Sequence, residues 1–152
     1  MADYQRALVA LDLGAGSTTL IERSRRLLAA DGTLLVAHVI EPTYDAYGFM
    51  PAVATRLSSL DAVALEDAER NIALVCSSQR IAETDRYLLR GHAATQLLTL
   101  AHEERVDLLV VGTRHRRGLA ALVGSTARVC ANRAHCDVMV VRLDAGGASD
   151  SP

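Results

Sequence analysis

Short apolar runs and segments with helical periodicity alternate along the 152 residues of this chain. The apolar runs are typical of strands buried in a parallel sheet, and apolar residues every three or four positions are typical of helices. The predicted strands are residues 7–11, 33–39, 81–89, 106–111 and 138–141. The predicted helices are residues 18–30, a long helix that includes 57–75, then 93–104 and 124–134. This β-α-β-α-β-α-β-α-β order predicts an α/β domain, with a parallel sheet, right-handed crossovers and helices on both faces.

Local signals set the expected ends of several elements. Thr19 and Glu22 have the spacing of a capping box at the start of the first helix, and Asp31 and Gly32 end it. Residues 41–52 contain two prolines and form the longest predicted loop of the body. The third strand is partly polar and is expected at a sheet edge, and Gly112 is expected to stop the fourth strand.

The long helix carries an apolar stripe that predicts its buried face. The stripe is Leu57, Leu60, Ala64, Ala68, Ile72 and Val75, and most of the charges fall off it, among them Arg56, Asp61, Asp67 and Arg70.

Composition favours a globular protein with an aliphatic core. Half of the residues are apolar and 22% are charged, with four Tyr, one Phe and no Trp. So few aromatic residues argue against a nucleic-acid surface built on base stacking. The net charge of -2 gives no general attraction to nucleic acid or to membranes.

The same features bound the organisation and location of the protein. Residues 1–143 are expected to form one domain, and residues 144–152, rich in Gly, Ser and Asp, a disordered tail. No leader pattern or long apolar run is visible, so we expect a cytoplasmic protein that does not span a membrane. The three cysteines lack C-x-x-C spacing and are expected to be reduced, packed thiols.

The segment after the fourth strand predicts an anion site. In α/β sheets ligands bind beyond the carboxyl ends of the strands, so the loops after strands one, two and four are the candidates. Here a glycine-bracketed basic loop, residues 112–118, precedes Gly124, Ser125 and Thr126 at the start of a helix. The first N–H groups of a helix lack partners and carry the positive end of its dipole, which favours an anion. The arginines of the loop, Arg114, Arg116 and Arg117, add positive charge suited to phosphate.

This segment resembles the nucleotide-binding signature of the universal stress protein family. That signature is Gly, two residues, Gly, eight or nine residues, then Gly-Ser or Gly-Thr, and Gly112, the spacing to Gly124, and Ser125 fit it. The resemblance covers nearly the whole chain. Residues 7–12, 35–39, 106–112 and 136–142 are similar to the family's first, second, fourth and fifth strands.

The resemblance implies a Rossmann-like three-layer sandwich of the adenine nucleotide alpha hydrolase type, with strand order 3-2-1-4-5. It places Asp12 near a ribose, Val39 against an adenine, and Gly124 to Thr126 on the phosphates of ATP bound with Mg²⁺. It also implies a homodimer through the last strand, residues 138–142. The expected nucleotide-binding residues are Ala10, Leu11, Asp12, Val39, Val111, Gly112, Arg114, His115, Arg116, Arg117, Gly118, Gly124, Ser125 and Thr126.

One departure leaves two functions open. His115 stands where the family's signature has its second glycine, and its side chain takes up space near the expected phosphates. The first function is a dimeric ATP-binding sensor or regulator of the stress response, with Tyr44 or Tyr47 covering the adenine. The alternative is an ATP-independent dimeric regulator of the same fold that acts through an unknown protein partner.

Other chemistries have weaker support. Gly14 and Gly16 lack the third glycine of a dinucleotide site, Glu41 is expected to lie beyond the second strand, and no Walker motif and no lysine are present. His38 is read as a satisfied core histidine. His92, His102 and His135 lack metal-ligand spacing, and Ser125 is in no nucleophile elbow. Asp12 is either a ligand contact or a turn cap. We expect that the protein is not an enzyme. At most, it would hydrolyse ATP slowly or phosphorylate its own Ser125 or Thr126.

Overall fold

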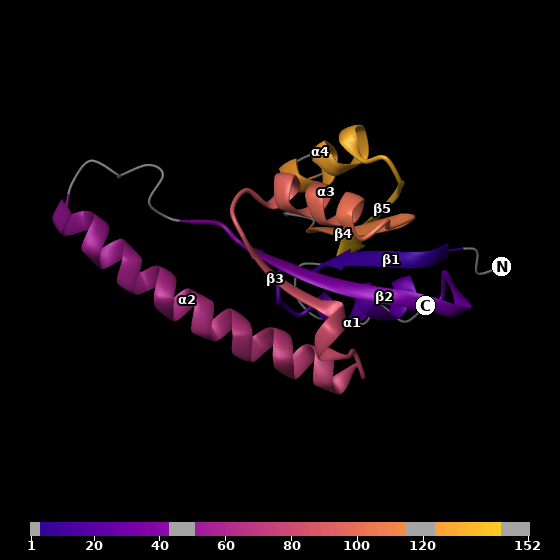
Figure 1. Cartoon of the computed structure of the whole chain (residues 1–152), viewed down its shortest axis with the longest axis horizontal. Helices are drawn as coiled ribbons and strands as arrows, with labels where there is room; N and C mark the ends of the chain where they lie inside the picture. The colour runs from indigo at the N-terminus through magenta and orange to yellow at the C-terminus, as the bar shows by residue number, and fades with distance from the viewer. Residues whose placement is uncertain (1–3, 43–50, 115–123, 144–152) are drawn as a thin grey trace.

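The computed structural model describes residues 4–42, 51–114 and 124–143. The elements, drawn in Figure 1, are β1 (Tyr4–Ala10), α1 (Ser17–Arg25), β2 (Leu28–Ile40), α2 (Pro51–Ser78), the short 3₁₀ helix η2 (Glu83–Asp85), β3 (Arg86–Arg90), α3 (Ala93–Glu103), β4 (Leu108–Arg114), α4 (Ser125–Arg133) and β5 (Asp137–Leu143). The predicted alternation of strands and helices is confirmed.

The five strands form one parallel sheet in the order β3-β2-β1-β4-β5. The chain first builds outward from β1 to β3 and then crosses back to place β4 on the other side of β1. The predicted order 3-2-1-4-5 is therefore confirmed, and the order reverses where Ala10 of β1 pairs with Val111 of β4. Ligands of open α/β sheets bind at such a reversal.

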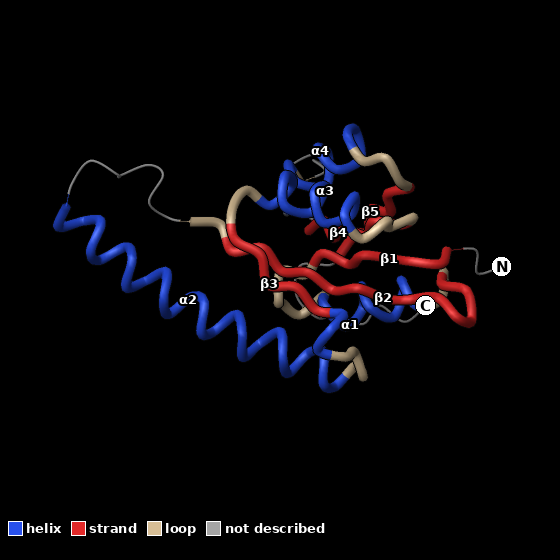
Figure 2. Tube along the Cα trace, viewed as in Figure 1, coloured by secondary structure: helices blue, strands red, loops and turns tan. Residues whose placement is uncertain are grey.

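Helices cover both faces of the sheet, as expected (Figure 2). Strand residues alternate between the two sides, so neighbouring residues such as Leu8 and Val9 enter different clusters. Val9 packs with α1 and α2 on one face, and Leu8 packs with α3 and α4 on the other. The core is aliphatic, with Leu8, Val9, Leu35 and Val110 fully buried.

The first helix is shorter than predicted. It ends at Arg25, and β2 already begins at Leu28 because that residue pairs with Tyr4. Asp31 and Gly32 lie within β2, beside a register irregularity, and do not end a helix. The predicted capping box is also wrong, since Gly16 is the N-cap and Thr19 is already the third residue of α1.

The buried face of α2 differs from the predicted stripe. Ala68 and Ile72 are buried as predicted, but Leu60 is 59% exposed and Ala64 is exposed. Asp61, which was expected off the stripe, is buried instead. Its carboxylate accepts a hydrogen bond from Arg90 at the end of β3, 2.9 Å away, and this ion pair compensates the burial of its charge.

The strand after α2 also starts later than predicted. The chain turns before this segment, where Arg80 has φ of 56° and the N–H of Ile81 donates to the carbonyl of Cys76, and residues 83–85 then form η2. β3 begins only at Arg86, and the prediction that it is an edge strand is confirmed.

Gly112 does not stop β4. The strand continues to Arg114 because Gly112, Thr113 and Arg114 pair with Val141, Arg142 and Leu143 of β5. It begins at Leu108 and not at Val106, since Arg105 has a left-handed φ of 53°.

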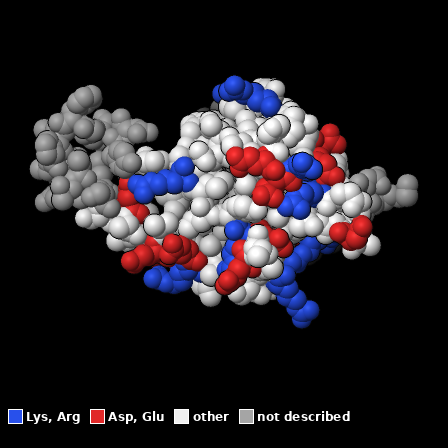
Figure 3. Space-filling view, viewed as in Figure 1, with Lys and Arg blue, Asp and Glu red and all other residues white. Residues whose placement is uncertain are grey.

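The remaining expectations concern chemistry and surface. The three cysteines are free, and burial raises the pKa of the thiols of Cys76 and Cys130. Acidic and basic side chains are interspersed on the face drawn in Figure 3. No helix among the described residues is long and apolar enough to cross a membrane. The predicted tail, residues 144–152, lies outside the described residues, and the domain limits stay a prediction.

Candidate functional site

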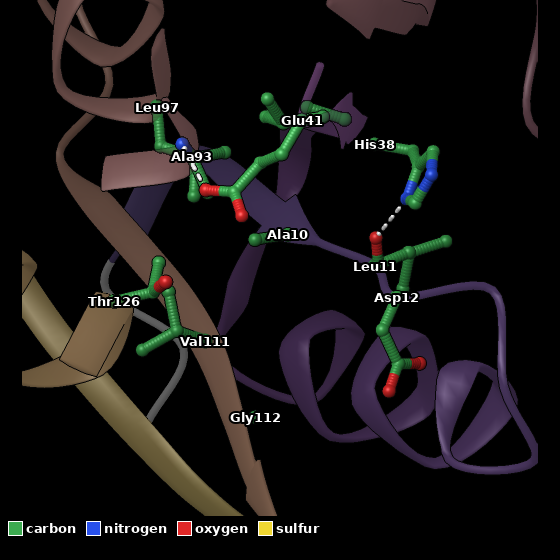
Figure 4. Close-up of a pocket in the computed structure, with 12 residues that line it drawn as sticks. Ala10, Leu11, Asp12, His38, Glu41, Ala93, Leu97, Val111, Gly112 and Thr126 are labelled. Carbon is green, nitrogen blue, oxygen red and sulfur yellow. Dashed lines mark hydrogen bonds between the residues drawn. The ribbon is translucent and has the colours of Figure 1, made fainter. Parts of the chain in front are cut away.

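A cavity of about 350 Å³ opens at the carboxyl ends of β1, β2 and β4, where the strand order reverses. The first turns of α3 and α4 complete its wall (Figure 4). Its lining residues are Ala10, Leu11, Asp12, Ala37, His38, Val39, Glu41, Ala93, Leu97, Val111, Gly112 and Thr126. Elements far apart in the sequence thus contribute to one space.

Half of the residues predicted from the sequence lie in this wall. They are Ala10, Leu11, Asp12, Val39, Val111, Gly112 and Thr126. Gly124 and Ser125 lie at the start of α4, are exposed and do not line the cavity. Arg114 is the last residue of β4. His115, Arg116, Arg117 and Gly118 lie outside the described residues, as do Tyr44 and Tyr47.

Leu11 ties the ends of β1 and β2 together beneath the cavity. Its N–H donates to the carbonyl of Ala37 at 2.8 Å, and its carbonyl lies 2.7 Å from Nδ1 of His38. Because a carbonyl oxygen only accepts, Nδ1 carries the proton. His38 is satisfied, as predicted, but it is half-buried in the cavity wall and is not a core residue.

Asp12 both caps a turn and lines the cavity. Its Oδ1 accepts the N–H of Gly14 at 2.8 Å, and the intervening Leu13 has φ of 61°. A leucine in the left-handed region stores strain, and such strain occurs at functional sites. The hydrogen bond of Asp12 holds this turn, so its carboxylate is fixed at the cavity edge, as Figure 4 shows.

Glu41 is the main feature of the site that the sequence reading missed. β2 runs to Ile40, so Glu41 lies just beyond the strand, as expected, and directly follows its last residue. Its carboxylate crosses the cavity mouth, and Oε1 accepts the N–H of Ala93, the first residue of α3, at 3.0 Å (Figure 4). Glu41 therefore supplies an acceptor and a negative charge to the N-terminus of α3.

The N-terminus of α4 has no such partner within the described part of the chain. The N–H of its N-cap, Gly124, donates to Oγ1 of Thr113 at 3.2 Å, so a neutral hydroxyl and not a carboxylate accepts this N–H. A Cβ placed on Gly124 would meet that oxygen at 3.9 Å and no other described atom within 4 Å. Thr126, on the first turn of α4, lines the cavity.

Gly112 has a structural reason to be glycine. A Cβ there would lie 2.8 Å from Cδ1 of Leu143 and 3.3 Å from Cδ1 of Leu20. The absence of a side chain lets Leu143 of β5 and Leu20 of α1 pack against β4. The two signature glycines therefore differ: a side chain at position 112 would displace Leu143, whereas no described atom crowds a side chain at position 124.

The described wall carries negative charge at one side, and the positive end of the helix dipole of α4 lies at the other. Asp12 and Glu41 are the charged residues among the described lining residues. Ala10, Val39 and Leu97 give the same wall an apolar surface. The described residues hold no cluster of three or more metal-ligating side chains. This arrangement suits a ligand with a flat apolar part, hydrogen-bond donors and an anionic end at α4.

The five lining residues that were not predicted are Ala37, His38, Glu41, Ala93 and Leu97. Ala93 and Leu97 lie on the start of α3, which the topology places over β1 and β2. Glu41 carried a sequence signal, since it is an acidic residue at the end of the second strand, beside the reversal.

Comparison with known proteins gives this geometry a family. A family model described as universal stress protein family matches residues 3–142. The chain belongs to the universal stress protein family. Universal stress protein A homolog 1 of Coxiella burnetii is 31% identical over 139 residues, which cover 91% of this chain and 96% of the relative. The predicted membership is therefore confirmed.

Solved universal stress proteins share the fold of this chain. UspA of Lactobacillus plantarum is 24% identical, with a TM-score of 0.66 and coverage of 93% of this chain and 100% of that one. A universal stress protein in complex with cAMP is 23% identical, with a TM-score of 0.54 and coverage of 91% of this chain and 96% of that one.

Proposed function

We propose that this universal stress protein binds ATP with Mg²⁺ in the cavity and acts as a dimeric sensor or regulator of the stress response. One observation carries the proposal. The cavity lies at the reversal between β1 and β4 and is bordered by the N-terminus of α4, where the described acceptor is the neutral hydroxyl of Thr113. A helix N-terminus without a carboxylate at such a position favours an anion such as phosphate.

The adenine and ribose fit the side of the cavity between β1, β2 and α3. Val39, Ala37 and Leu97 offer apolar surface for the base, while Glu41 offers a carboxylate to its donors. Asp12, at the end of β1, offers acceptors to the ribose hydroxyls. A base with an amino group suits this wall because carboxylates accept hydrogen bonds and repel anions.

The phosphates fit the side formed by α4. The N–H groups of its first turn and the hydroxyls of Ser125 and Thr126 are donors, and Gly124 leaves room for close approach. Arg114, Arg116 and Arg117 would add positive charge from the loop after β4. Mg²⁺ would reduce the repulsion between the phosphates and Asp12. A universal stress protein that binds cAMP accepts the same adenine, ribose and phosphate groups, which supports the class of ligand.

The described groups favour binding over turnover. In this proposal Asp12 and Glu41 contact the ribose and the base and not the terminal phosphate, and Nδ1 of His38 donates to the carbonyl of Leu11. General base catalysis needs a group within reach of the attacking water and able to accept its proton. We therefore propose a regulator and expect hydrolysis to be slow at most.

The homodimer is proposed to form through β5. This strand is one end of the sheet, so one of its edges has no neighbouring strand among the described residues. Val138, Met139 and Val140 are only partly buried there. Strand pairing with a second copy would satisfy the free backbone groups of that edge and cover these side chains.

His115 favours the alternative, an ATP-independent regulator that acts through a protein partner. Calorimetric titration with Mg-ATP decides between the two. The comparison uses the wild type, the variant R114A/R116A/R117A, and His115→Gly. Micromolar binding that weakens in the arginine variant and changes little in His115→Gly supports the nucleotide sensor. Absence of binding in the wild type, with binding gained in His115→Gly, supports the alternative.

A further inference from the structure

Helix α2 presents two different faces. One packs on the sheet beside β2 and β3 and buries Ala68, Ile72 and Cys76. The opposite face carries large apolar side chains in solvent, with Leu60 59%, Val63 56% and Leu74 63% exposed. The helix runs past the end of the sheet, and no other described helix or strand is drawn against this outer face in Figure 1.

The outer face has the spacing of a helix that packs against another helix. Its residues recur at alternating intervals of three and four positions, which is the heptad pattern of a coiled-coil seam. The seam is Leu60, Val63, Asp67, Arg70, Leu74 and Ser77. Its two central residues are charged and form an exposed ion pair, with Nη1 of Arg70 3.2 Å from Oδ1 of Asp67.

We propose that this seam pairs with the seam of a second copy of the chain in an antiparallel orientation. The pairing that aligns the two seams places Val63 against Leu74 of the second copy and Asp67 against Arg70 of the second copy. Leu60 then lies against Ser77 of the second copy. Because the arrangement is two-fold symmetric, every contact occurs twice.

Charge selects the antiparallel orientation. A parallel pair would place Asp67 against Asp67 and Arg70 against Arg70, and like charges at a seam are repulsive. The antiparallel pair turns both charged layers into opposite-charge contacts, flanked on each side by an apolar layer. The seam is thus complementary to itself, which points to a second copy as the occupant.

This contact is separate from the proposed β5 contact. α2 packs beside β2 and β3, whereas β5 is at the other end of the sheet. The two contacts can therefore form together, and a chain that makes both assembles as a tetramer or a larger assembly. A chain that makes the α2 contact alone is a dimer.

Charge reversal tests the pairing, with molecular mass measured by sedimentation velocity. Asp67→Arg places Arg against Arg70 of the second copy, and Arg70→Asp places Asp against Asp67, so each variant alone should have half the wild-type mass or less. The double variant D67R/R70D and an equimolar mixture of the two single variants restore opposite charges and should recover the wild-type mass. Glu69→Arg reverses an exposed charge of α2 off the seam and should leave the mass unchanged.

The rescue separates the pairing from general effects of charge or folding. A monomeric wild type, a mass that no reversal changes, or single variants that fail to associate when mixed would each overturn the proposal. A wild-type dimer that ignores all reversals leaves the β5 contact standing and removes this one. A wild-type dimer that becomes monomeric in the single variants supports the α2 contact and removes the β5 contact.

Discussion

Two helices begin at the same cavity, and the protein treats their N-termini differently. The N–H of Ala93 at the start of α3 donates to the carboxylate of Glu41, 3.0 Å away. At the start of α4 the N–H of Gly124 donates to the neutral hydroxyl of Thr113, and a Cβ on Gly124 would meet no other described atom within 4 Å. Within the described residues, one helix end carries a carboxylate of the protein and the other carries only a neutral hydroxyl.

This difference indicates which part of a ligand each side of the cavity favours. Both helix dipoles favour negative charge, but the dipole of α3 already has a carboxylate beside it. A second anion there would be repelled by Glu41. The phosphates of the proposed nucleotide are therefore expected at α4 and its uncharged apolar part near α3.

A side chain at Gly124 should break this division most strongly. Gly124→Val fills the space that the phosphates would occupy, and φ of -53° with ψ of 151° is open to valine, so the loss of stability should not exceed the cost of a poor N-cap residue, about 1 kcal/mol. We expect Mg-ATP affinity to fall at least about tenfold, or about 1.4 kcal/mol. Calorimetry and thermal melting measure the two effects.

Gly112→Val is the matched control for that change. Its Cβ would meet Leu143 at 2.8 Å, so this variant should lose about 1–3 kcal/mol of stability through overpacking. Equal loss of stability in both variants, or unchanged ATP affinity in Gly124→Val, would remove the distinction between the two glycines.

Removing the cap of α3 should have the next largest effect. Glu41→Ala takes the acceptor from the N–H of Ala93 and should lower the free energy of unfolding by about 1 kcal/mol, as the loss of a helix cap does. Urea denaturation measures the change. Glu41→Gln keeps an acceptor for this N–H and should lose less stability than Glu41→Ala. Equal losses of stability in the two variants would show that the cap acts through its charge alone.

Neutralising Asp12 should affect ligand binding more than folding. In Asp12→Asn the side-chain oxygen still accepts the N–H of Gly14, so the turn is kept and the free energy of unfolding should change by less than about 0.5 kcal/mol. Affinity for Mg-ATP should change a few-fold, and the ratio of Mg-ATP to Mg-free ATP affinity should fall. An unchanged ratio would show that Asp12 acts on the turn alone.

The smallest effect is expected at the opposite end of α3, away from the cavity. Hydrogen bonds from Arg6 and Tyr87 lower the pKa of Glu104, the C-cap of that helix. A lowered pKa gives stability that is present above the pKa of the unfolded chain and is lost as pH falls through the folded pKa. Glu104→Gln should remove about 0.5 kcal/mol at neutral pH and progressively less toward acid pH, measured by urea denaturation. A loss that is independent of pH would contradict this cause.

The fold could be predicted from the sequence because it depends on local patterns of apolar residues. Buried strands such as β1 and β4 have continuous apolar runs, and the alternation with helices allows few topologies. The errors arose where a distant residue decides the outcome. Asp61 is buried because Arg90 meets it, and Leu28 leaves the helix because Tyr4 pairs with it. Periodicity cannot report either contact.

The site was predictable to the extent that it follows strand ends and the family signature. Asp12, Val39, Gly112 and Thr126 lie in the cavity wall for that reason. Glu41 and Ala93 meet through a hydrogen bond between segments 52 residues apart, which the sequence does not show. The difference between the two helix ends therefore could not be predicted from the sequence.

The most direct test follows the backbone amides of both helix ends during a titration with Mg-ATP, by NMR of the isotope-labelled protein. The account predicts large shifts for the amides of Ser125, Thr126 and Ala127, and small ones for Ala93, whose N–H stays on Glu41. Larger shifts at Ala93 than at α4, or no shift at either end, would contradict it.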